Sequence, residues 1–363
     1  MTTPLLSIQS HLHPYSVREA ASFREALSQA ASSGAPDDAF WLLDSHIASL
    51  YSEDIAEFAS PARRLEIVAS EEAKSYAPVE QAFAAILRAG FRRNSHLIVV
   101  GGGVLQDIGC FVASLLMRGV RWTLVPTTLL AQCDSCIGSK SSLNVAGFKN
   151  QLGTFYAPHE VLLAPAVLSS LPPQDVRSGL GEAIKLHLIE GEEAFSTLKN
   201  ELAQLETDPQ ALRRIIVSSL GIKKPFIEED EFDRGRRKLL NYGHTFAHAF
   251  ESATNYAIPH GIAVSLGLVS ATWMSWKLGL VGEAHFHELH ETLRPYYSPF
   301  QEVVAGADVH GIEAAMKLDK KNQQTGVTFV LTRGPGCMEV VTVSREVVAP
   351  LLIELMAMWR ESK

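Results

Sequence analysis

Cysteine is scarce in this 363-residue sequence, and its four copies are too few for a disulfide framework. Cys133 and Cys136 form a CxxC pair, but no second pair follows at zinc-ribbon spacing and no thioredoxin-like pattern surrounds them. We therefore expect both to be small buried residues. Repeats and low-complexity tracts are also missing, and the 47% hydrophobic and 20% charged residues are typical of a globular protein.

Positive charge is not in excess either. The formal net charge of −8 argues against a nucleic-acid partner, although Lys140, Lys149 and Arg237 leave room for a local basic pocket. The first residues, MTTPLLSIQS, contain no basic region followed by an apolar run. No signal peptide is therefore expected, and we expect a cytoplasmic protein.

One apolar run, residues 261–281, is long enough to span a bilayer. It contains Lys277 and scattered serine, threonine and glycine, and it directly follows a histidine-rich stretch. These features favour a buried core helix, so no membrane partner is expected.

The first half of the chain alternates strand and helix patterns. Residues 1–35 are weakly patterned, and the SSGAPDD run at 32–38 indicates a loop. Strands are then expected at 40–43, 65–69, 96–100, 121–126 and 161–163, and helices at 78–89 and 108–116. This alternation predicts a parallel α/β sheet.

Gly101, Gly102 and Gly103 follow the strand at 96–100. Glycines between a strand and a helix allow a pyrophosphate to approach helix N–H groups, although the run is not GxGxxG and a structural turn also accounts for it. The polar segment 133–158 is too long for a simple turn. Its Lys140, Lys149 and Asn150 are suited to holding a phosphate.

From residue 168 onward the pattern is helical. Helices are expected at 181–189, 211–220, 239–253, 261–278, 284–293, 311–317 and 347–359, with a hairpin at 327–331 and 338–343. We expect an α/β domain with a parallel, Rossmann-like sheet at residues 1–165. A mainly α-helical domain is expected at residues 166–363.

The predicted helix at 239–253 carries His244 and His248, one turn apart on one face, and His260 follows a loop. Three such histidines suit Zn²⁺, although one of them can have another role. Spacing alone leaves open that they are ordinary core or surface residues.

Several motifs occur in a fixed order: GGGVLQD, MRG, VPTTLLAQCDS, GSKSSLN, KNQLGTFYAP, GEAIK, LLNYGHTFAHAFE, HG and DKKN. In this order the chain resembles the 3-dehydroquinate synthases and their relatives, the sugar phosphate cyclases, from about residue 44 to 322. The resemblance implies a nucleotide-binding sheet domain and a helical metal domain with the active site between them.

The resemblance also implies the ligands. The metal, Zn²⁺ or Co²⁺, would be held by Glu182, His244 and His260. NAD would be bound by Asp44, Glu71, Lys74, Gly102, Gly103, Asp107, Thr127, Thr128 and Lys149.

The implied substrate is a sugar phosphate. Its implied contacts and catalytic residues are Asp134, Lys140, Asn150, Lys185, Lys223, Asp233, Arg237, Asn241, His248 and Lys321. Arg118 would reach the neighbouring subunit's site, which implies a homodimer. Lys74, Arg118 and Lys321 can each also be read as a solvated surface charge.

By this resemblance, the enzyme would use NAD catalytically to convert 3-deoxy-arabino-heptulosonate 7-phosphate to 3-dehydroquinate and phosphate, in the shikimate pathway. Ser139, Ser141, Ser142 and Ile262 depart from the family pattern and bear on the exact substrate. The alternatives are a cyclase of specialised metabolism that uses sedoheptulose 7-phosphate or a related sugar, and a metal-dependent alcohol dehydrogenase. A non-catalytic binding protein has little use for so many ionisable groups.

Overall fold

The computed structural model describes residues 4–34, 38–146, 148–318 and 326–361. Its internal contacts divide the chain into two compact units. Unit 1 comprises Met1–Leu171 and Lys223–Phe232, and unit 2 comprises Pro172–Ile222 and Asp233–Lys363. The change of unit after Ile222 falls inside helix α8 (Ala211–Glu229), so the end of this helix belongs with unit 1.

Unit 1 is built on a seven-stranded sheet with the order β1-β2-β9-β6-β5-β3-β4. All neighbouring strands are parallel except β1 and β2. The strands are β1 (Leu6–Ile8), β2 (Tyr15–Glu19), β3 (Ala39–Asp44), β4 (Arg64–Ile67), β5 (His96–Gly101), β6 (Arg121–Pro126) and β9 (Glu160–Leu163). The predicted parallel α/β sheet is thus confirmed.

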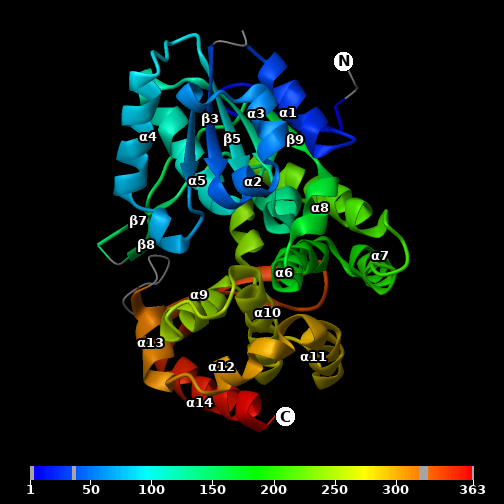
Figure 1. Ribbon diagram of the computed structural model, residues 1–363. Coiled ribbons are helices and arrows are strands. Elements are labelled where there is room, and N and C mark those ends of the chain that lie inside the picture. The colour runs from blue at the N-terminus through cyan, green and yellow to red at the C-terminus, as the bar shows by residue number, and fades with distance from the viewer. Residues whose placement is uncertain (1–3, 35–37, 147, 319–325, 362–363) are drawn as a thin grey trace. The chain divides into compact units, whose positions relative to one another are not determined.

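Helices cover both faces of this sheet. They are α1 (Phe23–Ser32), α2 (Ser45–Leu50), α3 (Ser52–Phe58), α4 (Tyr76–Arg88) and α5 (Gly103–Leu115). Figure 1 shows α4 and α5 on one side of strands β3 and β5, and α1 and α3 on the other. Because both faces are covered, every residue of β3 and β5 is buried.

The N-terminal part was under-predicted, because residues 1–35 contain β1, β2 and α1. The apolar face of α1 is Phe23, Ala26, Leu27 and Ala30. This i, i+3, i+4, i+7 pattern is helical, but two of its four members are alanines, which weakens the signal.

The polar segment 133–158 forms an antiparallel hairpin of β7 (Leu143–Val145) and β8 (Phe148–Leu152). A π-helical turn at Ala131–Ser135 precedes it. Cys133 and Cys136 lie in and just after this turn, and both are buried, as expected, with no disulfide bond among the described residues.

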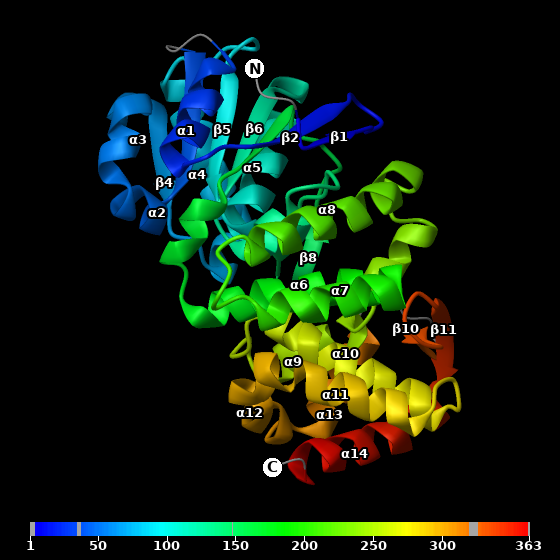
Figure 2. The ribbon, with the colours of Figure 1, turned by 90° about the vertical axis from the view of Figure 1, so that its right-hand side faces the viewer.

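In unit 2 the other elements pack around the helix α10 (His260–Lys277). The other helices are α6 (Pro173–Glu190), α7 (Glu192–Ala203), the first part of α8, α9 (His244–Ala253), α11 (Glu283–Tyr297), α12 (Gln301–Ala305), α13 (Val309–Leu318) and α14 (Arg345–Glu361). The predicted hairpin is β10 (Gly326–Thr332) and β11 (Met338–Ser344). Figure 2 shows α10 among α6, α9 and α11.

All of residues 261–275 in α10 are buried, so the predicted core helix is confirmed. Among the described residues no helix is long and apolar enough to cross a membrane.

The predicted single helix at 239–253 was wrong. The structure has a 3₁₀ helix, Arg236–Asn241, and then α9, with a break at Gly243. Gly243 has a φ of +80°, and a Cβ placed on it would lie 2.8 Å from the backbone nitrogen of Leu268 in α10. The break therefore results from close packing of α9 against α10, which a local pattern does not record.

A second backbone contact joins α6 to α10. A Cβ placed on Gly181 would lie 2.0 Å from the carbonyl oxygen of Gly261, and one placed on Gly261 would lie 1.7 Å from the carbonyl oxygen of Ser178. Only glycine fits where two helix backbones touch at these distances.

Replacing Gly181 by alanine is expected to lower the free energy of unfolding by about 1–3 kcal/mol, the usual cost of overpacking a core. The matched control is Gly221→Ala in α8, where an added Cβ meets nothing within 4 Å. That change should instead raise the free energy of unfolding by about 0.5–1 kcal/mol, because alanine loses less chain entropy. Urea unfolding of both variants measures the difference, and equal effects would contradict the close contact.

Candidate functional site

Three helices of unit 2 bring the predicted metal ligands together. Glu182 lies in α6, His244 is the first residue of α9, and His260, which follows a loop as expected, is the first residue of α10. Oε1 of Glu182 is 3.2 Å from Nε2 of His260 and 3.6 Å from Nε2 of His244. One ligand atom from each residue lies within 4.8 Å of the others, so a single ion can reach all three.

Further charged groups surround these ligands. The Nζ of Lys185 is 2.6 Å from Oε2 of Glu182. Nδ1 of His260 is 3.4 Å from both carboxylate oxygens of Glu251, a buried residue of α9. The side of His260 away from Glu182 therefore meets a second carboxylate.

Charged neighbours shift the pKa values of His260 and Glu182. Burial lowers the pKa of His260, but Glu251 and Glu182 outweigh burial and raise this pKa to about 10. Burial raises the pKa of Glu182, but Lys185 and His260 outweigh it and hold the pKa well below its usual range. The two carboxylates thus favour positive charge at this position, which is what a bound cation would supply.

His248 lies beside the same cluster. Its ring centroid is 5.4 Å from that of His244 and 6.0 Å from that of His260. Together with Glu251 and His260 it also forms a group whose ligand atoms lie within 4.8 Å of one another. His248 is therefore placed next to whatever Glu182, His244 and His260 bind.

Three further predicted residues of unit 2, Asp233, Arg237 and Asn241, precede α9. Arg237 is 3% exposed and lies with Asn241 in the 3₁₀ helix Arg236–Asn241. The amide of Asn241 donates to the carbonyl of Lys238 at 3.0 Å. Asp233 has a φ of +58°. Lys321 lies outside the described residues.

In unit 1 the predicted cofactor residues follow the carboxyl ends of neighbouring strands. Asp44 ends β3, and Thr127 follows β6. Gly102 and Gly103 follow β5 and begin α5. The Oδ1 of Asp44 accepts from the His46 N–H at 2.9 Å, and burial raises the pKa of Asp44. This is the edge of a parallel sheet where nucleotides bind.

Two features beside these residues leave a place for a polar ligand. A Cβ on Gly102 would lie 2.6 Å from Cγ2 of Thr128, whereas one on Gly103 would meet nothing within 4 Å. The Oγ1 of Thr127 is buried and has no hydrogen-bond partner among the described residues. Open space at a helix start and an unsatisfied buried hydroxyl both leave a place for a polar ligand.

A network of polar side chains links other predicted cofactor residues. Lys74 pairs with Asp107 at 2.7 Å and donates to Oδ1 of Asn150 at 3.2 Å. Lys149 lies 3.5 Å from Oε1 of Glu71. Burial raises the pKa of Asp107, although Lys74 opposes it. Lys74 is therefore a buried, paired residue, and the alternative of a solvated surface charge was wrong.

Asn144, which the sequence analysis missed, lies at the centre of this network. Its Nδ2 donates to Oε1 of Glu71 at 2.8 Å, and its Oδ1 accepts from the N–H of Asn150 at 3.0 Å. Its own N–H donates to the carbonyl of Lys74 at 2.6 Å. The sequence offers one indication of Asn144, its position in a polar segment, and the neighbouring residues share that indication.

Predicted substrate residues of unit 1 are partly paired with one another. The Nζ of Lys223 is 2.5 Å from Oδ1 of Asp134 and 2.5 Å from its carbonyl oxygen. Lys140 is exposed, with its Nζ 5.9 Å from the ring centroid of Phe155. Arg118 is exposed, with a φ of +67°, in the turn after α5.

The three serines that depart from the family pattern bond to other protein groups. Ser139 donates to Glu231 at 2.6 Å, and Ser142 donates to Asp107 at 2.9 Å. The Oγ of Ser141 is 2.8 Å from Oγ1 of Thr154. Ile262 is fully buried in α10.

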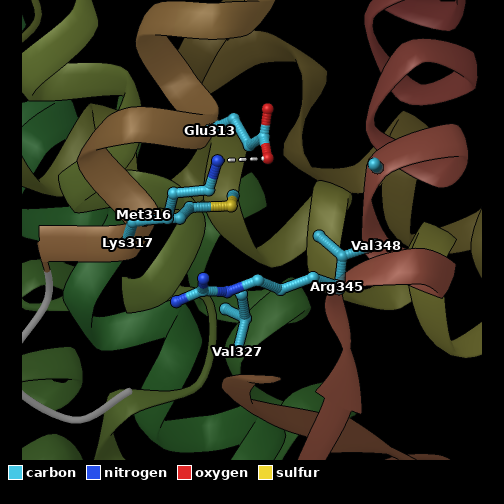
Figure 3. Close-up of a pocket in the computed structure, with 7 residues that line it drawn as sticks. Glu313, Met316, Lys317, Val327, Arg345 and Val348 are labelled. Atoms are coloured by element: carbon cyan, nitrogen blue, oxygen red, sulfur yellow. Dashed lines mark ion pairs between the residues drawn. The ribbon is translucent and has the colours of Figure 1, made fainter. Parts of the chain in front are cut away.

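A pocket in unit 2 is separate from these residues. It is lined by Glu313, Met316, Lys317, Val327, Arg345, Val348 and Ala349, and Figure 3 shows the ion pair of Glu313 with Lys317, both of which come from α13. None of the predicted site residues that the structure describes lines it, so it adds nothing to the candidate site.

Solved structures share the fold of this chain. A 2-epi-5-epi-valiolone synthase from Streptomyces hygroscopicus, with NAD⁺ and Zn²⁺ bound, superposes with a TM-score of 0.82 at 24% identity, over 99% of each chain. A 2-deoxy-scyllo-inosose synthase, complexed with carbaglucose-6-phosphate, NAD⁺ and Co²⁺, gives 0.81 at 22% identity, over 96% of this chain and 99% of that one. At these identities the likeness establishes the fold alone.

Sequence comparison establishes the family. The family model described as 3-dehydroquinate synthase N-terminal matches residues 64–178, and the one described as 3-dehydroquinate synthase C-terminal matches residues 179–322. The 3-dehydroquinate synthase of Acidithiobacillus ferrooxidans is 38% identical over 303 residues, which cover 81% of this chain and 82% of that protein. This chain belongs to the 3-dehydroquinate synthase family.

Proposed function

We propose that this protein is a 3-dehydroquinate synthase, a carbon–oxygen lyase that converts 3-deoxy-arabino-heptulosonate 7-phosphate to 3-dehydroquinate and phosphate. The observation that carries the proposal is the set of Glu182, His244 and His260 within reach of one ion, in a chain of this family. The requirement for NAD and a divalent metal is part of the proposal.

The donor set fits a catalytic metal. One carboxylate oxygen and two imidazole nitrogens are ligands that Zn²⁺ and Co²⁺ accept, and three protein ligands leave positions open for substrate oxygens. Glu251 lies against Nδ1 of His260, the arrangement that orients ligating histidines in many metal sites.

The residues of unit 1 fit NAD. Asp44 at the end of β3 suits a ribose hydroxyl, and Gly103 leaves open space at the start of α5 for a pyrophosphate. When bound, the metal supplies Lewis acidity toward substrate hydroxyls and NAD supplies a reversible hydride acceptor.

The other roles belong to side chains of this protein. The ammonium of Lys140 and the amides of Asn150 and Asn241 would bind the substrate's phosphate and hold it for elimination. The imidazole of His248 would transfer a proton or bind the phosphate beside the metal ligands. Lys321 is proposed for the phosphate on the family motif alone.

The sugar's carboxylate is assigned to Arg237 and Lys223. A guanidinium matches the planar geometry of a carboxylate, and an ammonium also binds one, which is the basis for expecting a carboxylated sugar. For Lys223 this argument needs correction, because Asp134 already neutralises it at 2.5 Å. The expectation of a carboxylated substrate therefore depends mainly on Arg237, through the fit of its guanidinium to a carboxylate.

The oligomer is a separate part of the proposal. Arg118 is exposed and follows Met117, which also has positive φ, so the turn projects from the end of α5. We assign Arg118 to the neighbouring subunit's site in a homodimer.

Phosphate release tests the proposed reaction. With 3-deoxy-arabino-heptulosonate 7-phosphate, the phosphate released should exceed the added NAD⁺ many-fold, with no lasting absorbance from NADH. Stoichiometric accumulation of NADH would point instead to an alcohol dehydrogenase. Faster turnover of sedoheptulose 7-phosphate would place the protein with the other cyclases.

Replacing Glu251 by glutamine is expected to weaken Zn²⁺ binding by about 10–100-fold, because His260 loses the carboxylate that orients it. Competition with a chromophoric chelator measures this affinity without reference to turnover. The control is Glu288→Gln, which removes an exposed carboxylate paired with Lys199. Unchanged affinity in Glu251→Gln would show that Glu251 does not support the metal.

A further inference from the structure

Ser139 holds an unusual backbone conformation beside the proposed phosphate-binding Lys140. Its φ is +64°, in the left-handed region that favours glycine, and it follows Gly138 at +113°. Ser139 is only 6% exposed. A side chain in this conformation is strained unless its surroundings compensate.

The carboxylate of Glu231 supplies that compensation. Oε1 of Glu231 accepts from the hydroxyl of Ser139 at 2.6 Å and from the hydroxyl of Ser10 at 2.6 Å. Oε2 accepts from the N–H of His11 at 2.5 Å. One carboxylate thus joins the Lys140 loop, the N-terminal segment and the chain that follows α8, all within unit 1.

The residue after Glu231, Phe232, contacts the aromatic ring over which the Lys140 ammonium lies. The Lys140 backbone forms an isolated antiparallel bridge with Phe155, and its ammonium lies over the Phe155 ring. That ring contacts the ring of Phe232 edge to face, with centroids 5.2 Å apart, and Phe232 contacts the ring of His11 at 5.5 Å. Glu231 therefore holds Ser139, the residue before Lys140, and Phe232 contacts Phe155, the residue bridged to Lys140.

We propose that Glu231 is a positioning residue, which acts through Ser139 to fix Lys140 for binding the substrate's phosphate group. This inference rests on the role proposed above for Lys140. Binding an anion restricts both the side chain of an exposed lysine and the backbone that carries it. A backbone that is already fixed has less conformational entropy to lose, so binding costs less. Ser139, which donates this hydrogen bond, is one of the residues that depart from the family pattern.

Four variants of the full-length protein test the proposal: Ser139→Gly, Glu231→Ala, their combination, and Glu231→Gln. Ser139→Gly removes the hydroxyl while glycine accepts the positive φ, so this variant keeps the fold. Glu231→Gln keeps an acceptor for Ser139. The control is Glu228→Ala, which removes a carboxylate of α8 that accepts from the N–H of Gln9 at 2.8 Å and pairs with Lys224.

The primary measurement is the Kd of inorganic phosphate by calorimetry, which does not depend on turnover. We expect Ser139→Gly and Glu231→Ala each to raise this Kd by roughly tenfold, the size of one charge-assisted hydrogen bond. The combined variant should be no weaker than Glu231→Ala, since both changes remove one interaction. Glu231→Gln should recover most of the affinity, and Glu228→Ala should match the unaltered protein. The Kd of NAD⁺ should stay within twofold in all variants.

Other outcomes would overturn either the role of Glu231 or the proposed reaction. Unchanged phosphate affinity in Glu231→Ala, additive losses in the combined variant, or no detectable phosphate binding by the unaltered protein would overturn the proposal. An unaltered protein that binds phosphate but releases none from the sugar would overturn the proposed reaction instead, and the phosphate Kd values would still decide the role of Glu231.

Discussion

Replacing His244 by alanine is expected to lower kcat/KM by roughly a hundredfold or more. A catalytic metal supplies several kcal/mol of transition-state stabilisation, and each 1.36 kcal/mol is a tenfold change in rate. Without His244, only Glu182 and His260 of the proposed ligands remain. Steady-state phosphate release and elemental analysis of the same samples check the activity and the metal content together.

Chelation provides the companion measurement. The unaltered protein should lose activity when its metal is removed and regain it with Zn²⁺ or Co²⁺, whereas His244→Ala should not respond to added metal at moderate concentration. The control is His287→Ala, an exposed histidine of α11 that pairs with Glu283 and should not affect activity. Full activity in a preparation shown to be metal-free would refute the metal centre.

Replacing Arg237 by leucine is expected to reduce kcat/KM for 3-deoxy-arabino-heptulosonate 7-phosphate by roughly ten- to a hundredfold. A hydrogen bond to a charged group contributes about 1.5–3 kcal/mol, and the planar guanidinium matches a carboxylate. Lys223 does not replace it, because Asp134 already holds that ammonium. Arg237→Lys should also be impaired, since an ammonium lacks the planar fork.

The comparison of two sugars makes this test specific. For sedoheptulose 7-phosphate, which has no carboxylate, Arg237→Leu should change kcat/KM far less, so the preference between the sugars should collapse. The neighbouring exposed Arg236→Leu is the control for a lost positive charge. An equal loss for both sugars would show that Arg237 does not recognise the carboxylate.

Elements with a strong local pattern could be predicted from the sequence. The strand predicted at 121–126 is β6, and the apolar run after His260 is the buried helix α10. In both, burial on all sides produces a continuous apolar run bounded by polar residues or glycine. The order of motifs also selected Glu182, His244 and His260, which the structure places within reach of one ion.

Features that depend on contacts between distant segments could not be predicted. The break at Gly243 arises from the backbone of Leu268, and the pairing of Lys223 with Asp134 joins residues 89 positions apart. Glu251 had a usable signal, since it lies one turn after His248 on the same face of α9. That signal becomes informative only when His260 is known to lie beside it.

The glycine contact between α6 and α10 has a consequence for how the proposed ion is taken up. Glu182 directly follows Gly181, and His260 directly precedes Gly261, so two of the three ligands adjoin a point where the helix backbones touch. Their separation is therefore set by main-chain contact before any ion arrives. Association then orders little further chain and buries little apolar surface, and calorimetry at several temperatures should register a heat-capacity change near zero. A large negative value would mean that the helices come together only as the ion binds.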